Sequence, residues 1–173
     1  MKRILFIILL CITSVSHADE PLPDPETYQV WSENKKYFAE INLEDDLTTV
    51  FRIGKNEERK ELWQMYGWFR WAYLSNDGMY IGIPFWGESL IPRDYRKEQV
   101  VFRLVKEGKL IRVIRLNELI ENFNNLIETA SHYFWGNYRG FNNNNEFIIE
   151  TVEKNHFTLN PNTGKLSKKK KTK

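Results

Sequence analysis

The chain repeats one pattern three times: a polar turn, a strand-like run that opens on Tyr or Phe, and a further strand or hairpin closed by a glycine turn. The three turns begin at Ser32, Ser75 and Asn142, which lie 43 and 67 residues apart. Runs of Val, Ile, Thr and aromatic residues between Gly, Asn and Asp are typical of β-strands. Recurrence of this kind indicates copies of one supersecondary unit. The sequence therefore predicts a mainly-β protein with about three antiparallel β-meander units.

Three such units are too few to close a ring, because propellers typically need four or more blades. We expect an open or curled stack of sheets. The run from Met79 to Pro84 is apolar on both faces, which predicts that the middle unit is covered on both sides. Polar residues such as Glu40 and Glu150 interrupt the outer units, which should be half-exposed. Their open edges need cover from a helix, from charge or from a partner chain, and strand addition is one binding mode for them.

A helix-like segment separates the second and third units. Its apolar residues recur at positions that share one face of an α-helix, and Asn117 is a suitable N-cap. These apolar residues are Leu119, Ile120, Phe123, Leu126 and Ile127. We expect an inserted amphipathic helix near 117–129 that packs on the sheets and explains the unequal spacing. A membrane-surface helix is the alternative, but the acidic polar face disfavours contact with anionic lipid.

The repeated turns resemble the blades of bacterial propellers of the TolB or YWTD type, which open with Ser-x-Asp/Asn-Gly-x-Tyr, as in "LSNDGMYIGIPF". The chain is also similar to a group of small, uncharacterised exported bacterial proteins in the stretches "TTVFR", "GWFRWAYLSNDG", "LIPRDY" and "SHYFWG". This second resemblance covers most of the chain after residue 18. Together the two imply propeller-blade-like β repeats, and neither implies a catalytic residue.

The first 18 residues have the features of a signal peptide. Lys2 and Arg3 precede an apolar run from Ile4 to Ile12, and small residues at Ser16 and Ala18 suit signal peptidase. A run of nine residues is too short to cross a bilayer of about 30 Å. An N-terminal core helix is the alternative. We expect cleavage near Ala18 and a periplasmic or secreted protein with a lead-in at 19–27, one β-rich domain at 28–166 and a tail at 167–173.

The near-neutral total charge hides an acidic domain with a basic tail. The chain has 25 basic and 23 acidic residues, but residues 19–164 hold 17 basic and 23 acidic ones, a formal charge of −6. The tail has no apolar periodicity, so we expect it to be disordered. Its lysines suit weak contact with an anionic surface. They are Lys168, Lys169, Lys170 and Lys171. An acidic body argues against nucleic acid as a partner, and the chain has no apolar run of transmembrane length.

The stretch from Gly67 to Gly87 holds three of the six tryptophans. Alternation along it predicts a hairpin that turns at Ser75–Gly78, with positive φ at Gly78. Gly82 has no side chain and would leave room for a neighbouring ring. We interpret this stretch as a densely packed core hairpin rather than as a ligand site.

The residues needed for most chemistry are missing or badly spaced. Cys11 is the only cysteine and leaves with the signal peptide, so no disulfide or thiolate remains. His132 and His156 are too far apart in sequence to suggest a metal site, and 44–46 lack the alternation of a calcium loop. Ser131 and His132 should face opposite ways if both lie in a strand. We expect no enzymatic activity and no cofactor, while a distant carboxylate pair of a hydrolase stays open as an alternative.

Aromatic and arginine residues in two loops are the best candidates for a contact surface, since these residue types dominate binding hot spots. They are Trp86, Arg93 and Tyr95 in the excursion at 84–99, and Trp135, Tyr138 and Arg139 in "FWGNYRGF". A packed Ω-loop is the alternative for the excursion. We expect an exported, non-enzymatic domain that binds a protein of the cell envelope, such as an inhibitor or immunity protein. The alternative is a carbohydrate- or ligand-binding module with an aromatic platform.

Overall fold

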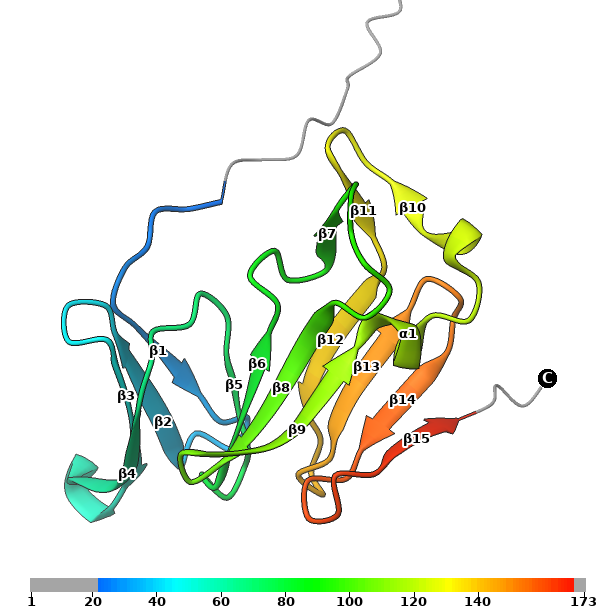
Figure 1. Ribbon diagram of the computed structural model, residues 1–173. Coiled ribbons are helices and arrows are strands. Elements are labelled where there is room, and N and C mark those ends of the chain that lie inside the picture. Colours follow the sequence, from blue (N-terminus) through cyan, green and yellow to red (C-terminus); the bar gives the residue numbers. More distant parts are fainter. Residues whose placement is uncertain (1–21, 170–173) are drawn as a thin grey trace, which may run out of the picture.

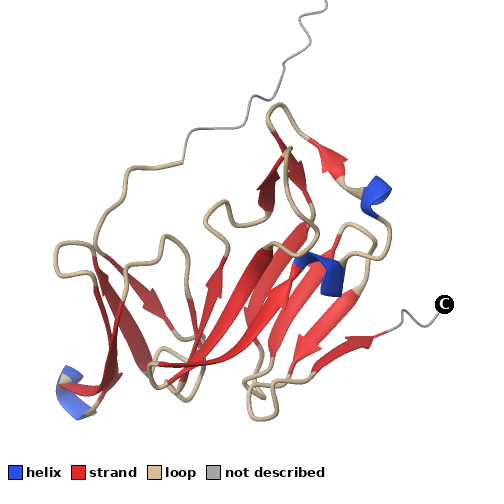
Figure 2. Ribbon diagram, viewed as in Figure 1, coloured by secondary structure: helices blue, strands red, loops and turns tan. Residues whose placement is uncertain are grey.

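The computed structural model describes residues 22–169, and the predicted signal peptide and the last four residues lie outside this range. The described part is mainly β, as the sequence predicts. Its strands form three four-stranded antiparallel sheets and one smaller sheet. The three large sheets open like a fan from their first strands (Figure 1), and helical turns are few and short (Figure 2).

Each large sheet is a meander in which the strands pair in the order of the chain. The first sheet contains β1 (Tyr28–Trp31), β2 (Tyr37–Asn42), β3 (Leu47–Ile53) and β4 (Arg59–Tyr66), with the short helix η1 (Lys55–Glu57) before β4. The second contains β5 (Tyr73–Leu74), β6 (Tyr80–Pro84), β8 (Val100–Lys106) and β9 (Lys109–Arg115). The third contains β12 (Gly136–Phe141), β13 (Phe147–Thr151), β14 (His156–Leu159) and β15 (Leu166–Lys169). The three expected meander units are therefore present.

A small sheet lies at one end of the fan (Figure 1). It pairs β7 (Leu90–Pro92) with β11 (His132–Phe134), and β11 with β10 (Ile127–Glu128). The sequence analysis did not predict this sheet. It joins the excursion between β6 and β8 to the segment between the second and third sheets.

The three predicted turn starts occupy the same place in each sheet, between the first and second strands. In the first two turns the serine hydroxyl accepts a hydrogen bond from the amide five residues later, at 3.1 Å for Ser32 and Tyr37 and 2.9 Å for Ser75 and Tyr80. Asn142 Oδ1 accepts one from the Glu146 amide at 2.9 Å. Short polar side chains stabilise turns by such local bonds, which explains why the turns could be recognised from sequence.

The same turns are hydrogen-bonded to one another, with Asn76 at the centre. The Asn34 amide donates to Asn76 Oδ1 at 2.9 Å, and Asn34 Nδ2 donates to the Asn76 carbonyl at 2.7 Å. The Asn76 amide in turn donates to Asn145 Oδ1 at 2.8 Å. Asparagine side chains and turn backbones thus hold the three sheets together at their inner ends.

Replacing Asn76 with alanine should lower the free energy of unfolding by about 1 kcal/mol, because the Asn34 amide loses its acceptor. Denaturant unfolding followed by circular dichroism measures this change. Asn143→Ala, at an exposed position of the third turn, is the control and should change stability by less than about 0.5 kcal/mol. Equal stability of wild type and Asn76→Ala would contradict the bridging role.

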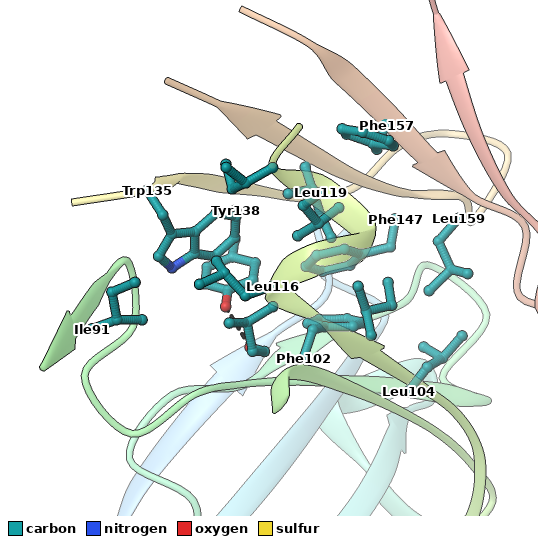
Figure 3. Packing of buried hydrophobic residues seen from close by; sticks show 14 of the residues in the cluster. Ile91, Phe102, Leu104, Leu116, Leu119, Trp135, Tyr138, Phe147, Phe157 and Leu159 are labelled. Carbon is teal, nitrogen blue, oxygen red and sulfur yellow. Dashed lines mark hydrogen bonds between the residues drawn. The ribbon is translucent and has the colours of Figure 1, made fainter. Parts of the chain in front are cut away.

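The middle sheet is buried on both faces at β6, as expected, whereas its edge strand β9 is largely exposed. All of β6 is buried, with Ile81 and Ile83 packed in one cluster with Ala39 and Val50 of the first sheet. The opposite face contributes Tyr80 to the larger cluster shared with the third sheet. Figure 3 shows this larger cluster, in which the rings of Phe102 and Phe147 lie with centroids 4.3 Å apart. The core therefore consists of two layers, one on each side of the second sheet.

The outer faces of the fan differ from each other. On the third sheet, the outward side chains include the ion-paired residues Arg139, Glu150 and His156. On the first sheet, Phe38 stacks between Trp31 and Phe51 at 4.9 Å from each. The expected polar outer surface is therefore present on the third sheet, whereas the first sheet mixes polar residues with a row of aromatic rings.

The predicted helix at 117–129 is wrong in length. The structure has α1 (Leu116–Leu119), the short helix η2 (Phe123–Asn125) and then β10. The Glu153 carboxylate ends α1, since it accepts hydrogen bonds from the amides of Glu121 at 3.0 Å and Asn122 at 2.8 Å. Burial opposes ionisation of Glu153, but these bonds, Asn125 and Lys168 outweigh it and lower its pKa. Tertiary bonds to the third sheet thus replace the helical ones.

The predicted disorder of the tail is wrong for residues 167–169. These residues belong to β15, which pairs with β14 from Leu159↔Leu166 to His156↔Lys169. Lys168 Nζ lies 2.6 Å from Glu121 Oε1, so an ion pair within the molecule holds this lysine. Pairing with the edge of β14 therefore outweighs repulsion between the lysines. Lys170 and Lys171 lie outside the described residues, and a contact with an anionic surface stays a prediction.

Candidate functional site

The first half of the predicted core hairpin is a surface loop. Only Tyr73 and Leu74 form β5, while residues 67–72 lie outside the strands. Gly67 has a φ of +124°, and the Asp46 carboxylate accepts a hydrogen bond from the Trp68 amide at 2.6 Å. This bond to the β2–β3 turn holds the chain away from a strand path. The assignment of alternating faces to residues 68–72 is therefore wrong, although the turn and β6 are as predicted.

The loop brings two tryptophans and an arginine beside Trp86, and we call Trp68, Arg70, Trp71 and Trp86 the tryptophan cluster. The rings of Trp68 and Trp86 meet edge to face with centroids 5.8 Å apart. The Arg70 guanidinium carbon lies 4.5 Å from the centroid of Trp86 and 5.7 Å from that of Trp68. Cation–π contacts of this kind fix both the arginine and the rings.

Hydrogen bonds fix the orientation of the cluster. Trp71 Nε1 donates to the Trp86 carbonyl at 3.1 Å, and Trp68 Nε1 donates to the Glu26 carbonyl at 2.8 Å. Tyr28 also holds the loop in place, because its hydroxyl donates a hydrogen bond to the Phe69 carbonyl at 2.6 Å. Burial raises the pKa of Tyr28, so it remains a neutral donor.

Two hollows share Trp68, Arg70 and Trp71. The lead-in hollow has a volume of about 210 Å³ and is closed on one side by Pro23, Asp24 and Glu26. The open hollow, of about 130 Å³, extends to Trp86 and Arg103. Among the described residues that line the open hollow there are two arginines and no carboxylate. The open hollow therefore favours an anionic or acceptor-rich ligand.

Trp86 is the most exposed aromatic ring among the predicted site residues, with 52% of its surface accessible. Arg93 and Tyr95 do not join it. Arg93 forms an ion pair with Glu128 at 2.9 Å and donates to the carbonyls of residues 129 and 130. Tyr95 stacks on Phe123 with centroids 6.0 Å apart. These two residues hold the small sheet together, so the expected common surface of Trp86, Arg93 and Tyr95 is absent.

Trp135 and Tyr138 are core residues, which corrects their assignment to a contact surface. Trp135 is fully buried and Tyr138 is 7% exposed. Their rings meet edge to face at 5.2 Å (Figure 3), and the Tyr138 hydroxyl donates to the Val101 carbonyl. Burial raises the pKa of Tyr138 well above its ordinary value. Neither ring can serve as an exposed platform for a sugar.

Arg139 lies at a third hollow, the axial pocket, where the innermost strands of the three sheets meet. The pocket has a volume of about 370 Å³. A bulge between Tyr138 and Gly140 directs Arg139 outward, where its Nε donates to Glu150 at 2.6 Å. Tyr73 also lines the pocket, and burial and then Glu88 raise its pKa to about 12. Because Arg139 is already paired, this pocket offers less unsatisfied polarity than the tryptophan cluster.

Chemical groups for catalysis are sparse in the described residues. Within residues 22–169 no group of three His, Cys, Asp or Glu side chains could hold a metal ion. Glu33 is the one carboxylate among the described residues that line the axial pocket. Ser131 Oγ lies 2.7 Å from His132 Nδ1, contrary to our expectation, because Ser131 belongs to a bend before β11 and not to the strand. This contact sits on an exposed turn.

Across residues 22–169 we find no helix with the length and apolar character needed to span a membrane. No protein-family model, curated protein or solved structure matches this chain. The site must therefore be interpreted from its own geometry.

Proposed function

We propose that this protein is a non-enzymatic binding domain that recognises a protein partner through the tryptophan cluster. The observation that carries the proposal is the half-exposed Trp86 ring, stacked on Arg70 and fixed against Trp68. Tryptophan and arginine are the residue types most enriched at binding hot spots. An exported chain, as the N-terminal sequence predicts, would meet this partner in the cell envelope or outside the cell.

The rigidity of the cluster supports recognition of a partner. Three of its side chains are held by hydrogen bonds to main-chain carbonyls: Trp68, Arg70 and Trp71. Side chains that are already ordered lose little conformational entropy when a ligand binds. The cluster can therefore contribute strongly to affinity from a small area.

The proposal has one narrower form and one alternative. An inhibitor or immunity protein would use the cluster to block a partner enzyme. A carbohydrate-binding module would instead stack a sugar on Trp86, but the guanidinium of Arg70 already lies over that ring at 4.5 Å. We favour a protein partner for this reason.

Trp86→Ala should weaken binding to a captured envelope partner roughly 30-fold, as expected when a hot-spot residue worth about 2 kcal/mol is removed. The experiment is a pull-down from envelope extract with residues 19–173 as bait, followed by titration of the identified partner. Leu110→Ala is the matched control, because Leu110 is 57% exposed on β9, a strand that contributes no residue to the tryptophan cluster. Circular dichroism checks that both variants fold.

Partner binding that survives Trp86→Ala unchanged would overturn the assignment of the site. Binding lost equally in Trp86→Ala and Leu110→Ala would point to a general loss of solubility or structure. If a glycan array gives specific binding and no protein is captured, the carbohydrate alternative replaces the proposal.

A further inference from the structure

The described part of the lead-in, residues 22–27, runs into β1 (Figure 1), and three of its residues line the lead-in hollow together with side chains of the tryptophan cluster. Its sequence is Leu-Pro-Asp-Pro-Glu-Thr. Proline fixes its own φ, and it disfavours the helical region for the residue before it. Leu22 and Asp24 each precede a proline, so this segment is held extended by its own covalent chemistry.

Side chains of the cluster bind the lead-in through its main-chain carbonyls. Trp68 Nε1 donates to the Glu26 carbonyl at 2.8 Å, and the Arg70 guanidinium donates to the Pro23 carbonyl. None of residues 22–27 belongs to a strand. An extended, proline-containing segment held by aromatic rings and side-chain donors is the arrangement by which aromatic grooves recognise proline-rich peptides.

The negative charge of the lead-in complements the positive charge of the arginines that line the two hollows. Asp24 and Glu26 lie beside Arg70 in the lead-in hollow, and the open hollow adds Arg103. The sequence just before the described residues is also acidic, with Asp19 and Glu20. Acidic side chains and prolines therefore occur together in the segment that shares the lead-in hollow with Arg70 and two tryptophans.

The lead-in leaves part of its hollow empty and one polar atom of the tryptophan cluster without a hydrogen bond. The lead-in hollow keeps about 210 Å³ of space between the segment and the cluster. Arg70 Nε is buried and has no hydrogen-bond partner among the described residues. A longer or better-fitting peptide would fill this space and supply an acceptor to Arg70.

We propose that the tryptophan cluster is a receptor for acidic, proline-containing, extended peptide segments, and that the lead-in is its intramolecular occupant. The inference rests on the proposed function and names the chemistry of the partner. A tethered segment competes at an effective concentration near the millimolar range. A partner segment must therefore bind the cluster tightly enough to displace the tethered lead-in.

The test uses residues 19–173, which retain every described residue, and a synthetic peptide of residues 19–27. The lead-in variant carries Pro21→Gly, Pro23→Gly and Pro25→Gly in the same chain, so the tether remains but loses its extended preference. Isothermal titration calorimetry should show the peptide binding the lead-in variant at least tenfold more tightly than wild type. Arg70→Gln in the lead-in variant should remove most of this binding.

Two control peptides separate the contributions. A peptide with alanine at its three proline positions, and a peptide with Asp and Glu changed to Asn and Gln, should each bind at least fivefold more weakly. Binding should also weaken as salt rises, because the arginines contribute by charge. Circular dichroism of every protein variant must match wild type for the comparison to count.

The proposal is overturned if the folded lead-in variant does not bind the peptide, or if it binds both control peptides equally well. Equal binding to wild type and lead-in variant would reject the intramolecular occupancy. If the peptide fails while a captured partner still depends on Trp86, the proposed function stands and only this inference falls. If the peptide fails to bind and no captured partner depends on Trp86, the tryptophan cluster is not a binding site.

Discussion

Replacing Trp135 with alanine should lower the free energy of unfolding by about 3 to 5 kcal/mol, the usual cost of removing a large buried aromatic side chain. Trp135 is fully buried, and its ring meets Tyr138 edge to face at 5.2 Å (Figure 3). Removal of the indole leaves a cavity in the larger core cluster that neighbouring rings, fixed by their own packing, cannot fill.

Equilibrium unfolding in urea, followed by tryptophan fluorescence and circular dichroism, measures this loss. Trp135→Phe is the control and should cost much less, because it keeps a ring in the core. It also removes an indole nitrogen that is buried without a hydrogen-bond partner among the described residues. A Trp135→Ala protein as stable as wild type would contradict the core assignment and return Trp135 to the list of contact residues.

Gly82→Val should destabilise the protein by about 3 kcal/mol, at the upper end of what overpacking usually costs. A Cβ atom at Gly82 would lie 2.7 Å from Cζ of Phe102 and 3.0 Å from Cε2 of Phe147. Both rings are fully buried between the second and third sheets. Neither ring can move aside without disturbing the core layer between the two sheets, so the sheets would have to separate.

Thermal unfolding provides the measurement, and Gly54→Val is the matched control. Gly54 has an extended backbone with φ −88°, and the nearest atom to an added Cβ lies 3.4 Å away. The control should change stability by less than about 1 kcal/mol. Similar losses in the two variants would mean that valine is poorly tolerated for backbone reasons, and the close packing at Gly82 would not be the cause.

The fold was predictable wherever its determinants are local. The turns at Ser32, Ser75 and Asn142 rest on hydrogen bonds between residues four or five positions apart. Gly82 was identified as a place for a ring because it interrupts a run of apolar strand residues. Such features leave a mark in a short window of sequence, and they sufficed to predict three meanders with a buried middle unit.

The wrong or missing predictions concern contacts between residues that lie far apart in the sequence. The apolar spacing at 117–129 suits a helix, but Glu153, about 30 residues later, captures the amides that would continue it. The small sheet pairs β7 with β11, which are about 40 residues apart. Neither contact can be found in a local sequence pattern, because each joins segments that only the folded chain brings together.

The candidate site was half predicted. Trp86 was identified as a contact residue, whereas Trp68, Arg70 and Trp71 were assigned to a strand and hence to the core. The bond from the Trp68 amide to Asp46, which breaks the strand, joins residues 22 positions apart. The hydrogen bonds from Trp68 and Arg70 to the lead-in were not predicted, although the stretch from Asp19 to Glu26 is acidic and proline-rich.

The continuity of each sheet along the chain has a consequence for how the protein folds. Residues 28–66, 73–115 and 136–169 each complete one four-stranded sheet with their own strands. Pairing between neighbours in sequence closes short loops, which costs less entropy and favours fast folding. The first sheet can therefore assemble before the rest of the chain is available. We expect the contacts between sheets to form last, when the asparagine-linked turns meet and the third meander packs over Phe102.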